Sequence, residues 1–243
     1  MKYSEFIKMV NDAANDSHQS SLTEVVNNGL KLKDVVNPTH EMCMIAVTGN
    51  GFALQFVEEQ TDEICLAAVN QNGLALEYVE KQTPKLCMAA VEQNGFALEY
   101  VKKQTPKLCM AAVKQNGYAL DIVKDQTPKI CMAAVKQNSS ALQFAEKQTR
   151  KICLAVVREN GQMLRHVRRK YQTPEICLTA IKNDETSLRY VREQTLELCL
   201  AAVRQNGFSL QYVREQTPEI CLAAVMQESD ALDYVNRPIF DPE

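Results

Sequence analysis

Apolar and polar residues along the chain follow a block pattern that returns every 22 residues. Each block opens with Thr and continues through Ile or Leu, Cys, Leu or Met and then Ala-Ala-Val, as in 83–91. After a polar stretch, a second apolar pair places Leu98 and Val101 three residues apart. A fixed period between about 20 and 50 residues is typical of stacked repeat proteins. The pattern therefore predicts a tandem-repeat fold.

The nine cysteines measure this period directly. They stand 22 residues apart, except for 24 residues between Cys153 and Cys177. Stepping back 22 residues from Cys43 reaches Ser21, which Gly29, Leu32 and Val35 follow in the expected positions, so the period extends one repeat upstream. We predict an N-terminal capping helix at 1–16, a solenoid at 17–238 and a tail at 239–243. The predicted repeats are 17–38, 39–60, 61–82, 83–104, 105–126, 127–148, 149–172, 173–194, 195–216 and 217–238.

Each repeat predicts two short helices. A threonine four residues before the cysteine can cap the first helix, and a proline often follows where no amide donor is needed. Asn-Gly pairs such as Asn72-Gly73 indicate that this helix ends on a glycine in the left-handed conformation. The second helix is expected to run to the next threonine, as in the nine residues 96–104.

Helices this short are marginal alone, so stacking between repeats must stabilise them. The predicted fold is therefore an all-α solenoid of helix-turn-helix repeats, and the pattern does not choose between a right- and a left-handed superhelix. Leucine stands eleven residues after the cysteine position in every repeat, from Leu32 to Leu232. We expect this column to be buried.

The cysteine column is interpreted as packing. A free thiol in an apolar position behaves as a small hydrophobe. Equivalent atoms of adjacent repeats lie about 8–10 Å apart, whereas a disulfide needs Cα atoms within about 7 Å. No C-x-x-C pair is present, so no metal site is predicted. The recurrent Gln before each threonine and the Asn after the first helix are also interpreted as structural, satisfying backbone groups at the turns.

Merged copies from 195–213 and 217–225 spell "TPEICLAAVRQNGFALQYV". This phrase resembles a short helical-pair tandem repeat family that is catalogued as a domain of unknown function (number 4116). The resemblance covers residue 39 to about residue 235, and more weakly 17–38. It implies an all-helical repeat protein and brings no catalytic or binding residues to this chain.

Charge is where the repeats differ most. Residues 105–172 hold 13 basic and 4 acidic side chains, whereas 39–104 hold 4 and 9, and 173–243 hold 6 and 12. The total charge of −3 therefore conceals a basic belt between acidic ends. Basic residues recur 5, 12 and 15 positions after the cysteine, and 149–172 also holds a two-residue insertion. The candidate partner- or anion-binding surface comprises Lys114, Lys136, Arg158, Arg165, His166, Arg168, Arg169, Lys170, Lys182, Arg189, Arg192, Arg204 and Arg214.

Two interpretations of this belt stay open. It is either a solvated face with a tolerated insertion at a turn, or a surface that binds an acidic protein, a phosphoinositide headgroup or nucleic acid. Isolated Lys and Arg steer a partner without specifying it. The sequence therefore identifies the surface better than it identifies the ligand.

Catalysis is not expected. The three histidines, at 18, 40 and 166, lie in different repeats, and no catalytic triad, HExxH motif or phosphate-binding glycine loop is present. We predict a non-catalytic protein-interaction scaffold whose central basic surface, about 105–214, receives an acidic protein partner. The alternatives are an electrostatic binder of nucleic acid or anionic lipid, and a structural or self-associating spacer. No small-molecule substrate and no cofactor are expected.

The apolar runs are shorter than the ~18 residues of a transmembrane helix. The first residues, "MKYSEFIKMVNDAAND", lack the apolar block of a secretory signal. We therefore expect a cytoplasmic protein, and export into a host cell by a route without such a signal stays open.

Overall fold

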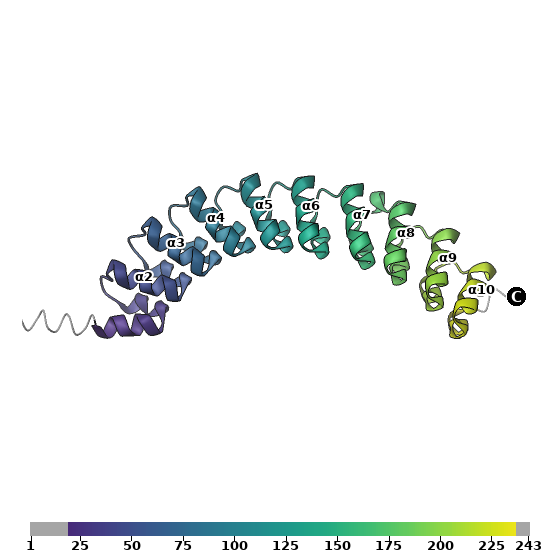
Figure 1. Ribbon diagram of the computed structural model, residues 1–243, viewed down its shortest axis with the longest axis horizontal. Helices are drawn as coiled ribbons and strands as arrows, with labels where there is room; N and C mark the ends of the chain where they lie inside the picture. Colours follow the sequence, from purple (N-terminus) through teal and green to yellow (C-terminus); the bar gives the residue numbers. More distant parts are fainter. Residues whose placement is uncertain (1–18, 237–243) are drawn as a thin grey trace, which may run out of the picture. The chain divides into compact units, whose positions relative to one another are not determined.

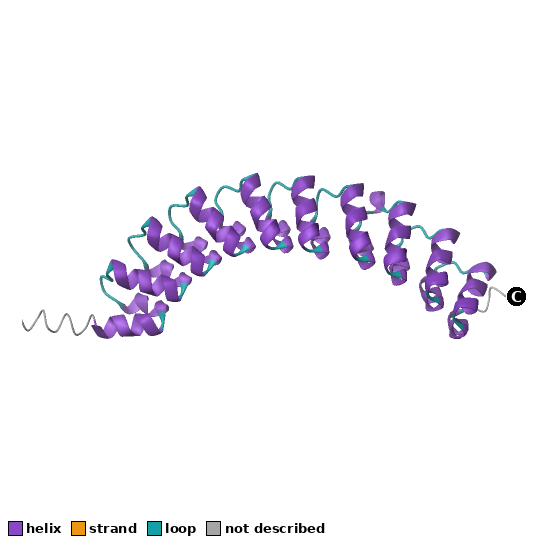
Figure 2. Cartoon of the chain, viewed as in Figure 1, coloured by secondary structure: helices purple, strands orange, loops and turns teal. Residues whose placement is uncertain are grey.

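The computed structural model describes residues 19–236, and within that range it contains α-helices and 3-10 helices but no strand (Figures 1 and 2). The chain is an all-α solenoid of tandem helical repeats, as the period predicts. The predicted capping helix at 1–16 and the tail at 239–243 lie outside the described residues. Two compact parts, Met1–Lys124 and Asp125–Glu243, are called here the N-terminal and the C-terminal part.

In the N-terminal part, residues 19–27 are helical and α-helices then alternate with 3-10 helices (η). The elements are η1 (Gly29–Asp34), α2 (His40–Gly49), η2 (Gly51–Phe56), α3 (Asp62–Gln71), η3 (Gly73–Tyr78), α4 (Pro84–Gln93), η4 (Gly95–Tyr100), α5 (Pro106–Gln115) and η5 (Gly117–Ile122).

The C-terminal part continues the alternation, with one additional 3-10 turn, η8, at the insertion. The elements are α6 (Pro128–Gln137), η6 (Ser139–Phe144), α7 (Arg150–Glu159), η7 (Gly161–His166), η8 (Arg169–Tyr171), α8 (Pro174–Asn183), η9 (Glu185–Tyr190), α9 (Leu196–Gln205), η10 (Gly207–Tyr212), α10 (Pro218–Gln227) and η11 (Ser229–Tyr234).

Each part has two layers. Consecutive α-helices pack side by side in one layer, consecutive six-residue 3-10 helices pack in the other, and the core lies between the layers. Each helix from α2 to α10 begins at the predicted threonine cap; for example, the Thr83 hydroxyl accepts a hydrogen bond from the Leu86 amide at 3.3 Å. The threonine prediction is thus confirmed from Thr39 to Thr217.

The second helix differs from the prediction. It is a six-residue 3-10 helix and not a nine-residue α-helix. In η4, for example, the helix ends at Tyr100, and the amide of the following Val101 donates to the Leu98 carbonyl. Gly95, Leu98 and Val101 are all buried at a spacing of three. That spacing matches the three residues per turn of a 3-10 helix, so these residues face the core together, beside the buried Ala97.

The glycine after the first helix also has a different role. Among the described residues no glycine has a positive φ, so the left-handed helix end was a wrong prediction. The preceding residue, such as Asn94, is extended and its side chain caps the 3-10 helix by accepting from the Phe96 amide at 3.0 Å. The structural interpretation of the asparagines is therefore confirmed.

The core contains the predicted columns. The leucine eleven residues after the cysteine position is at most 1% exposed from Leu32 to Leu210. Leu232 is the exception, at 64% exposed, because among the described residues no later repeat packs against η11. Burial of this column therefore requires the next repeat, as expected for a solenoid.

The glutamines before the threonines link neighbouring repeats. Gln82 donates to the Tyr100 carbonyl at 2.8 Å and accepts from the Lys102 amide at 3.0 Å. The Cys87 thiol also donates to its side-chain oxygen, at 3.7 Å. One side chain thus satisfies the backbone groups that the end of a 3-10 helix leaves free. This arrangement supports the structural interpretation of the glutamines.

Two buried hydroxyls predict a stability effect. Ser187 and Ser209 occupy a position that is mostly alanine elsewhere, they are at most 1% exposed, and within residues 19–236 their hydroxyls have no hydrogen-bond partner. Because such a group costs about 1–3 kcal/mol, Ser209→Ala is expected to raise the free energy of unfolding by about 1 kcal/mol in urea titrations. The reverse change, Ala97→Ser, is the matched control and should lower it. A loss of stability in Ser209→Ala would contradict this account.

Candidate anion-binding site

The basic residues that the structure brings together lie on three consecutive repeats of the C-terminal part. Arg165 and Arg189 are exposed on η7 and η9, one residue before the end of each helix. Arg192 lies three residues after Arg189, just beyond η9, and Arg214 takes the corresponding position after η10. Arg189, Arg192 and Arg214 nevertheless line one hollow, so the two positions bring their arginines to the same side of the layer.

These arginines surround a hollow of about 400 Å³, which we call the arginine hollow. It is lined by Arg165, Arg169, Gln172, Arg189, Tyr190, Arg192 and Arg214. A second hollow of about 450 Å³ shares three of these residues and adds Lys170 and Glu193. A concave surface lined by guanidinium groups concentrates positive potential and attracts anions.

Neighbouring residues fix two of the guanidinium groups. The Arg189 group lies over the rings of Tyr190 and Tyr212, at 5.0 and 5.3 Å from their centroids, and donates to the side chain of Gln162 at 3.3 Å. The Arg214 group donates to the backbone carbonyls of Val191 and Arg192, at 2.8 and 2.9 Å. Both cations are therefore oriented before any ligand arrives.

Carboxylates neutralise little of this charge. Arg169 pairs with Glu193 at 3.0 Å, and both side chains are about three-quarters exposed (75% and 78%). Within residues 19–236, none of the other four arginines of the hollow has a carboxylate at ion-pair distance. A further acidic residue, Asp184, accepts from the Thr186 amide at 3.0 Å and the Gln162 side chain at 2.7 Å. Burial raises the pKa of Asp184, but these hydrogen bonds and the charge of Arg189 lower it below its ordinary value.

The two-residue insertion shapes one wall of the hollow. It adds the 3-10 turn η8, which carries Arg169 and Lys170, and the Lys170 ammonium lies 5.0 Å from the Tyr171 ring centroid. Gln172 consequently donates to the Leu164 and Val167 carbonyls of its own repeat, at 3.3 and 3.2 Å. Its counterpart Gln194 also donates to the leucine carbonyl of its own repeat, at 3.1 Å, but its second acceptor is the Tyr212 carbonyl at the end of the next 3-10 helix, at 2.9 Å.

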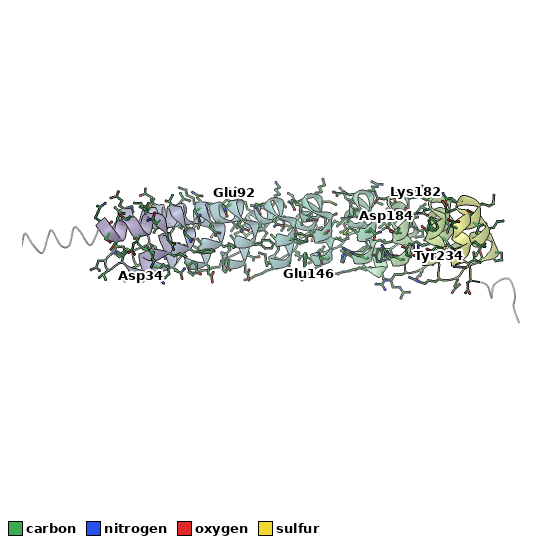
Figure 3. All side chains as sticks on the ribbon, turned by 90° about the horizontal axis from the view of Figure 1, so that it is seen from below. Asp34, Glu92, Glu146, Lys182, Asp184 and Tyr234 are labelled. Carbon is green, nitrogen blue, oxygen red and sulfur yellow. The ribbon has the colours of Figure 1, made fainter. Side chains whose placement is uncertain are left out.

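Other predicted residues lie elsewhere. The basic residues five positions after the cysteine occupy the last turns of the α-helices: Lys136, Arg158, Lys182 and Arg204 in the C-terminal part, and Lys114 in the N-terminal part. Figure 3 places Lys182 at one margin of the C-terminal part and Glu146 at the other. Glu146 shares its repeat position with Arg192 and Arg214. The expected belt is therefore divided between two margins.

Two further predicted residues are engaged within the protein. The Arg168 side chain donates to the Ala145 carbonyl at 3.4 Å. His166 accepts from the Arg165 side chain at 2.8 Å, and burial, followed by the charge of Arg165, lowers the pKa of its imidazole below the ordinary value. His166 is therefore neutral at neutral pH and adds no cation to the hollow.

The cysteine thiols are buried and are expected to be unreactive. All nine are buried and unpaired. Burial raises the pKa of Cys153 and of Cys177 to about 11, so these thiols stay protonated and are poor nucleophiles. Within residues 19–236, no group of His, Cys, Asp and Glu is arranged to hold a metal ion.

Sequence reasoning missed the residues that orient Arg189. Tyr190, Tyr212 and Gln162 belong to three different repeats. The available signal was the aromatic column that directly follows the arginine positions at 165 and 189. A separate hollow of about 850 Å³ in the N-terminal part was also missed. Its walls mix Leu66 and Met88 with both lysines and glutamates, so it lacks the uniform charge of the arginine hollow.

Comparison with known proteins identifies the repeat. The family described as domain of unknown function (DUF4116) matches residues 40–83, 61–104, 83–126 and 173–217. The first three matches begin about one repeat apart, and the four together cover more than half of the chain. The chain belongs to the DUF4116 family. No curated protein and no solved structure matches it.

Membership in DUF4116 confirms the resemblance read from the repeat phrase. The matched ranges leave out 127–172, which hold Ser139 in place of the repeat glycine and the two-residue insertion. The arginine hollow begins inside this unmatched stretch and continues into the DUF4116 match at 173–217.

Proposed function

We propose that this DUF4116 protein is a non-catalytic interaction scaffold whose arginine hollow binds an acidic segment of a protein partner. The observation that carries the proposal is the charge imbalance of the hollow. Five guanidinium groups line about 400 Å³, and only Arg169 has an ion-pair partner among the described residues. Unpaired cations facing one hollow repel each other, and an anionic ligand relieves that repulsion.

The chemistry of the lining supports binding over catalysis. Arginine stays charged at every physiological pH and donates hydrogen bonds without transferring protons. The buried thiols are protonated, and His166 is held by Arg165. Nine unpaired cysteines also suit a reducing compartment, so we propose a cytoplasmic site of action. None of the helices in residues 19–236 has the length and apolarity that crossing a bilayer requires.

The test compares charge reversal at the hollow with charge reversal elsewhere. Arg165→Glu with Arg192→Glu is expected to weaken binding of a fluorescent Asp- and Glu-rich peptide by about ten-fold or more, because charge-assisted hydrogen bonds are lost. Arg158→Glu with Arg204→Glu makes the same charge change in the last turns of α7 and α9. It should weaken binding of the peptide by about two-fold or less, because salt screens long-range attraction. Fluorescence anisotropy measures binding, and circular dichroism verifies the fold.

Three results would overturn the proposal. Equal losses in both double variants would show general attraction without a site. Tighter binding of duplex DNA or of anionic lipid vesicles than of the peptide, with a steep dependence on salt, would favour those ligands instead. If the protein bound none of these probes, the alternative of a structural or self-associating spacer would be favoured.

A further inference from the structure

The number and placement of donors in the arginine hollow carry information about the ligand. Four guanidinium groups, those of Arg165, Arg189, Arg192 and Arg214, have no ion pair among the described residues. A carboxylate brings one charge, so matching four cations would crowd four acidic side chains into about 400 Å³. A phosphomonoester brings about −1.5 to −2 charges and three acceptor oxygens. Two phosphate groups would therefore match the hollow.

The orientation of the guanidinium groups favours the same ligand. Arg189 is held over two tyrosine rings and Arg214 is held by two backbone carbonyls. Each uses only one or two of its five N–H donors in these contacts. A fixed planar fork binds phosphate oxygens in a bidentate manner, which a lysine ammonium cannot do. The basic side chains of the hollow itself are all arginine.

The aromatic residues of the site argue against a nucleic acid. Proteins that bind single strands stack the bases on exposed aromatic rings. Here Arg189 already lies over Tyr190 and Tyr212, so these rings serve to orient a cation. The ring faces that Arg189 covers are therefore not open to a stacked base.

We propose that the arginine hollow recognises a phosphorylated segment of a partner protein, with Arg165 and Arg192 as direct phosphate ligands and Arg189 and Arg214 as pre-oriented ones. This inference rests on the proposed function and names the partner's chemistry. Phosphorylation of the partner would then act as the switch that permits docking. The unphosphorylated segment would lack the charge needed to fill the hollow.

Three fluorescent peptides of one sequence test the inference. The first carries two adjacent phosphoserines, the second replaces the region with four glutamates of similar total charge, and the third is unphosphorylated. At physiological salt the doubly phosphorylated peptide is expected to bind at least about ten-fold tighter than the glutamate peptide. The unphosphorylated peptide should show no measurable binding.

Variants that keep the positive charge distinguish bidentate phosphate binding from general electrostatic attraction to an anionic peptide. Arg165→Lys with Arg192→Lys keeps the charge and removes two forks, so it should weaken the phosphopeptide by about five- to ten-fold and the glutamate peptide by less than about two-fold. The matched control, Arg158→Lys with Arg204→Lys, should change neither affinity. Circular dichroism confirms that all variants fold.

The outcomes distinguish this inference from the proposed function. Equal affinity for the phosphorylated and glutamate peptides would overturn phosphate recognition and leave the acidic-segment scaffold standing. Binding of neither peptide would overturn both. An oligonucleotide of equal charge that binds more tightly than the phosphopeptide, and is weakened by the two lysine substitutions, would replace the phosphoprotein with a nucleic acid.

Discussion

Replacing Leu98 with alanine is expected to lower the free energy of unfolding by about 2–5 kcal/mol. Leu98 is fully buried in η4. That helix packs against α4 and α5 in the other layer and against η3 and η5 in its own. Because all four neighbours are held by contacts of their own, they cannot collapse into the space that the lost side chain leaves. The cost should therefore include a cavity as well as the lost transfer of apolar surface.

Urea unfolding followed by circular dichroism measures this effect, and the chain provides its own control. Leu232 occupies the same position of a later repeat but is 64% exposed. Leu232→Ala removes the same atoms and should change the free energy of unfolding by about 0.5 kcal/mol or less. Similar losses at the two positions would show that stacking between repeats is not what buries the leucine column.

The repeat period and the caps could be predicted because they are local and occur many times. A threonine begins each helix from α2 to α10, and a cysteine follows it at the same spacing in each of these nine repeats. The second helix could not be resolved in this way. Over six residues, Leu98 and Val101 fit the period of an α-helix nearly as well as that of a 3-10 helix. The hydrogen bond from the Val101 amide to the Leu98 carbonyl, three residues earlier, identifies the helix as 3-10.

The candidate site was predictable in composition but not in arrangement. The excess of arginine and lysine in 105–172 is a property of the sequence. Which positions converge depends on how the 3-10 helix is turned relative to its α-helix. Arg189 and Arg192 line one hollow, whereas Lys182, from the same repeat, lies in the last turn of α8 and is not among the residues that line it. The sequence pattern alone does not give the orientation of the 3-10 helix relative to its α-helix.

At the insertion, contacts that recur in the other repeats are replaced by a turn that contributes to the arginine hollow. Gln172 gives up the carbonyl that its counterparts reach in the next repeat, and within residues 19–236 Cys177 has no glutamine partner of the kind that Cys87 has. The turn that replaces these contacts brings Arg169 to the hollow. Departure from the repeat therefore coincides with the highest density of positive charge, as expected where function and repetition compete.

The glycine that opens most of the 3-10 helices is a second place where the neighbouring repeat decides the residue. An added Cβ at Gly73 would lie 2.4 Å from the Ala90 carbonyl oxygen and 2.9 Å from the Gln93 side-chain oxygen, both in the next repeat. The Gly73 amide donates to that same Gln93 oxygen at 2.6 Å. The glycine thus permits close approach of two repeats, and its conformation is one that any residue adopts.

Gly73→Ala is accordingly expected to lower the free energy of unfolding by about 1–3 kcal/mol, because the junction must open to admit one methyl group. Gly49→Ala is the matched control. Gly49 ends α2, and no atom lies within 4 Å of its added Cβ, so alanine should be neutral or stabilising by up to about 1 kcal/mol. Urea titrations of both variants measure the difference. If Gly73→Ala proved as stable as Gly49→Ala, the close contact between repeats would not be what requires glycine at this position.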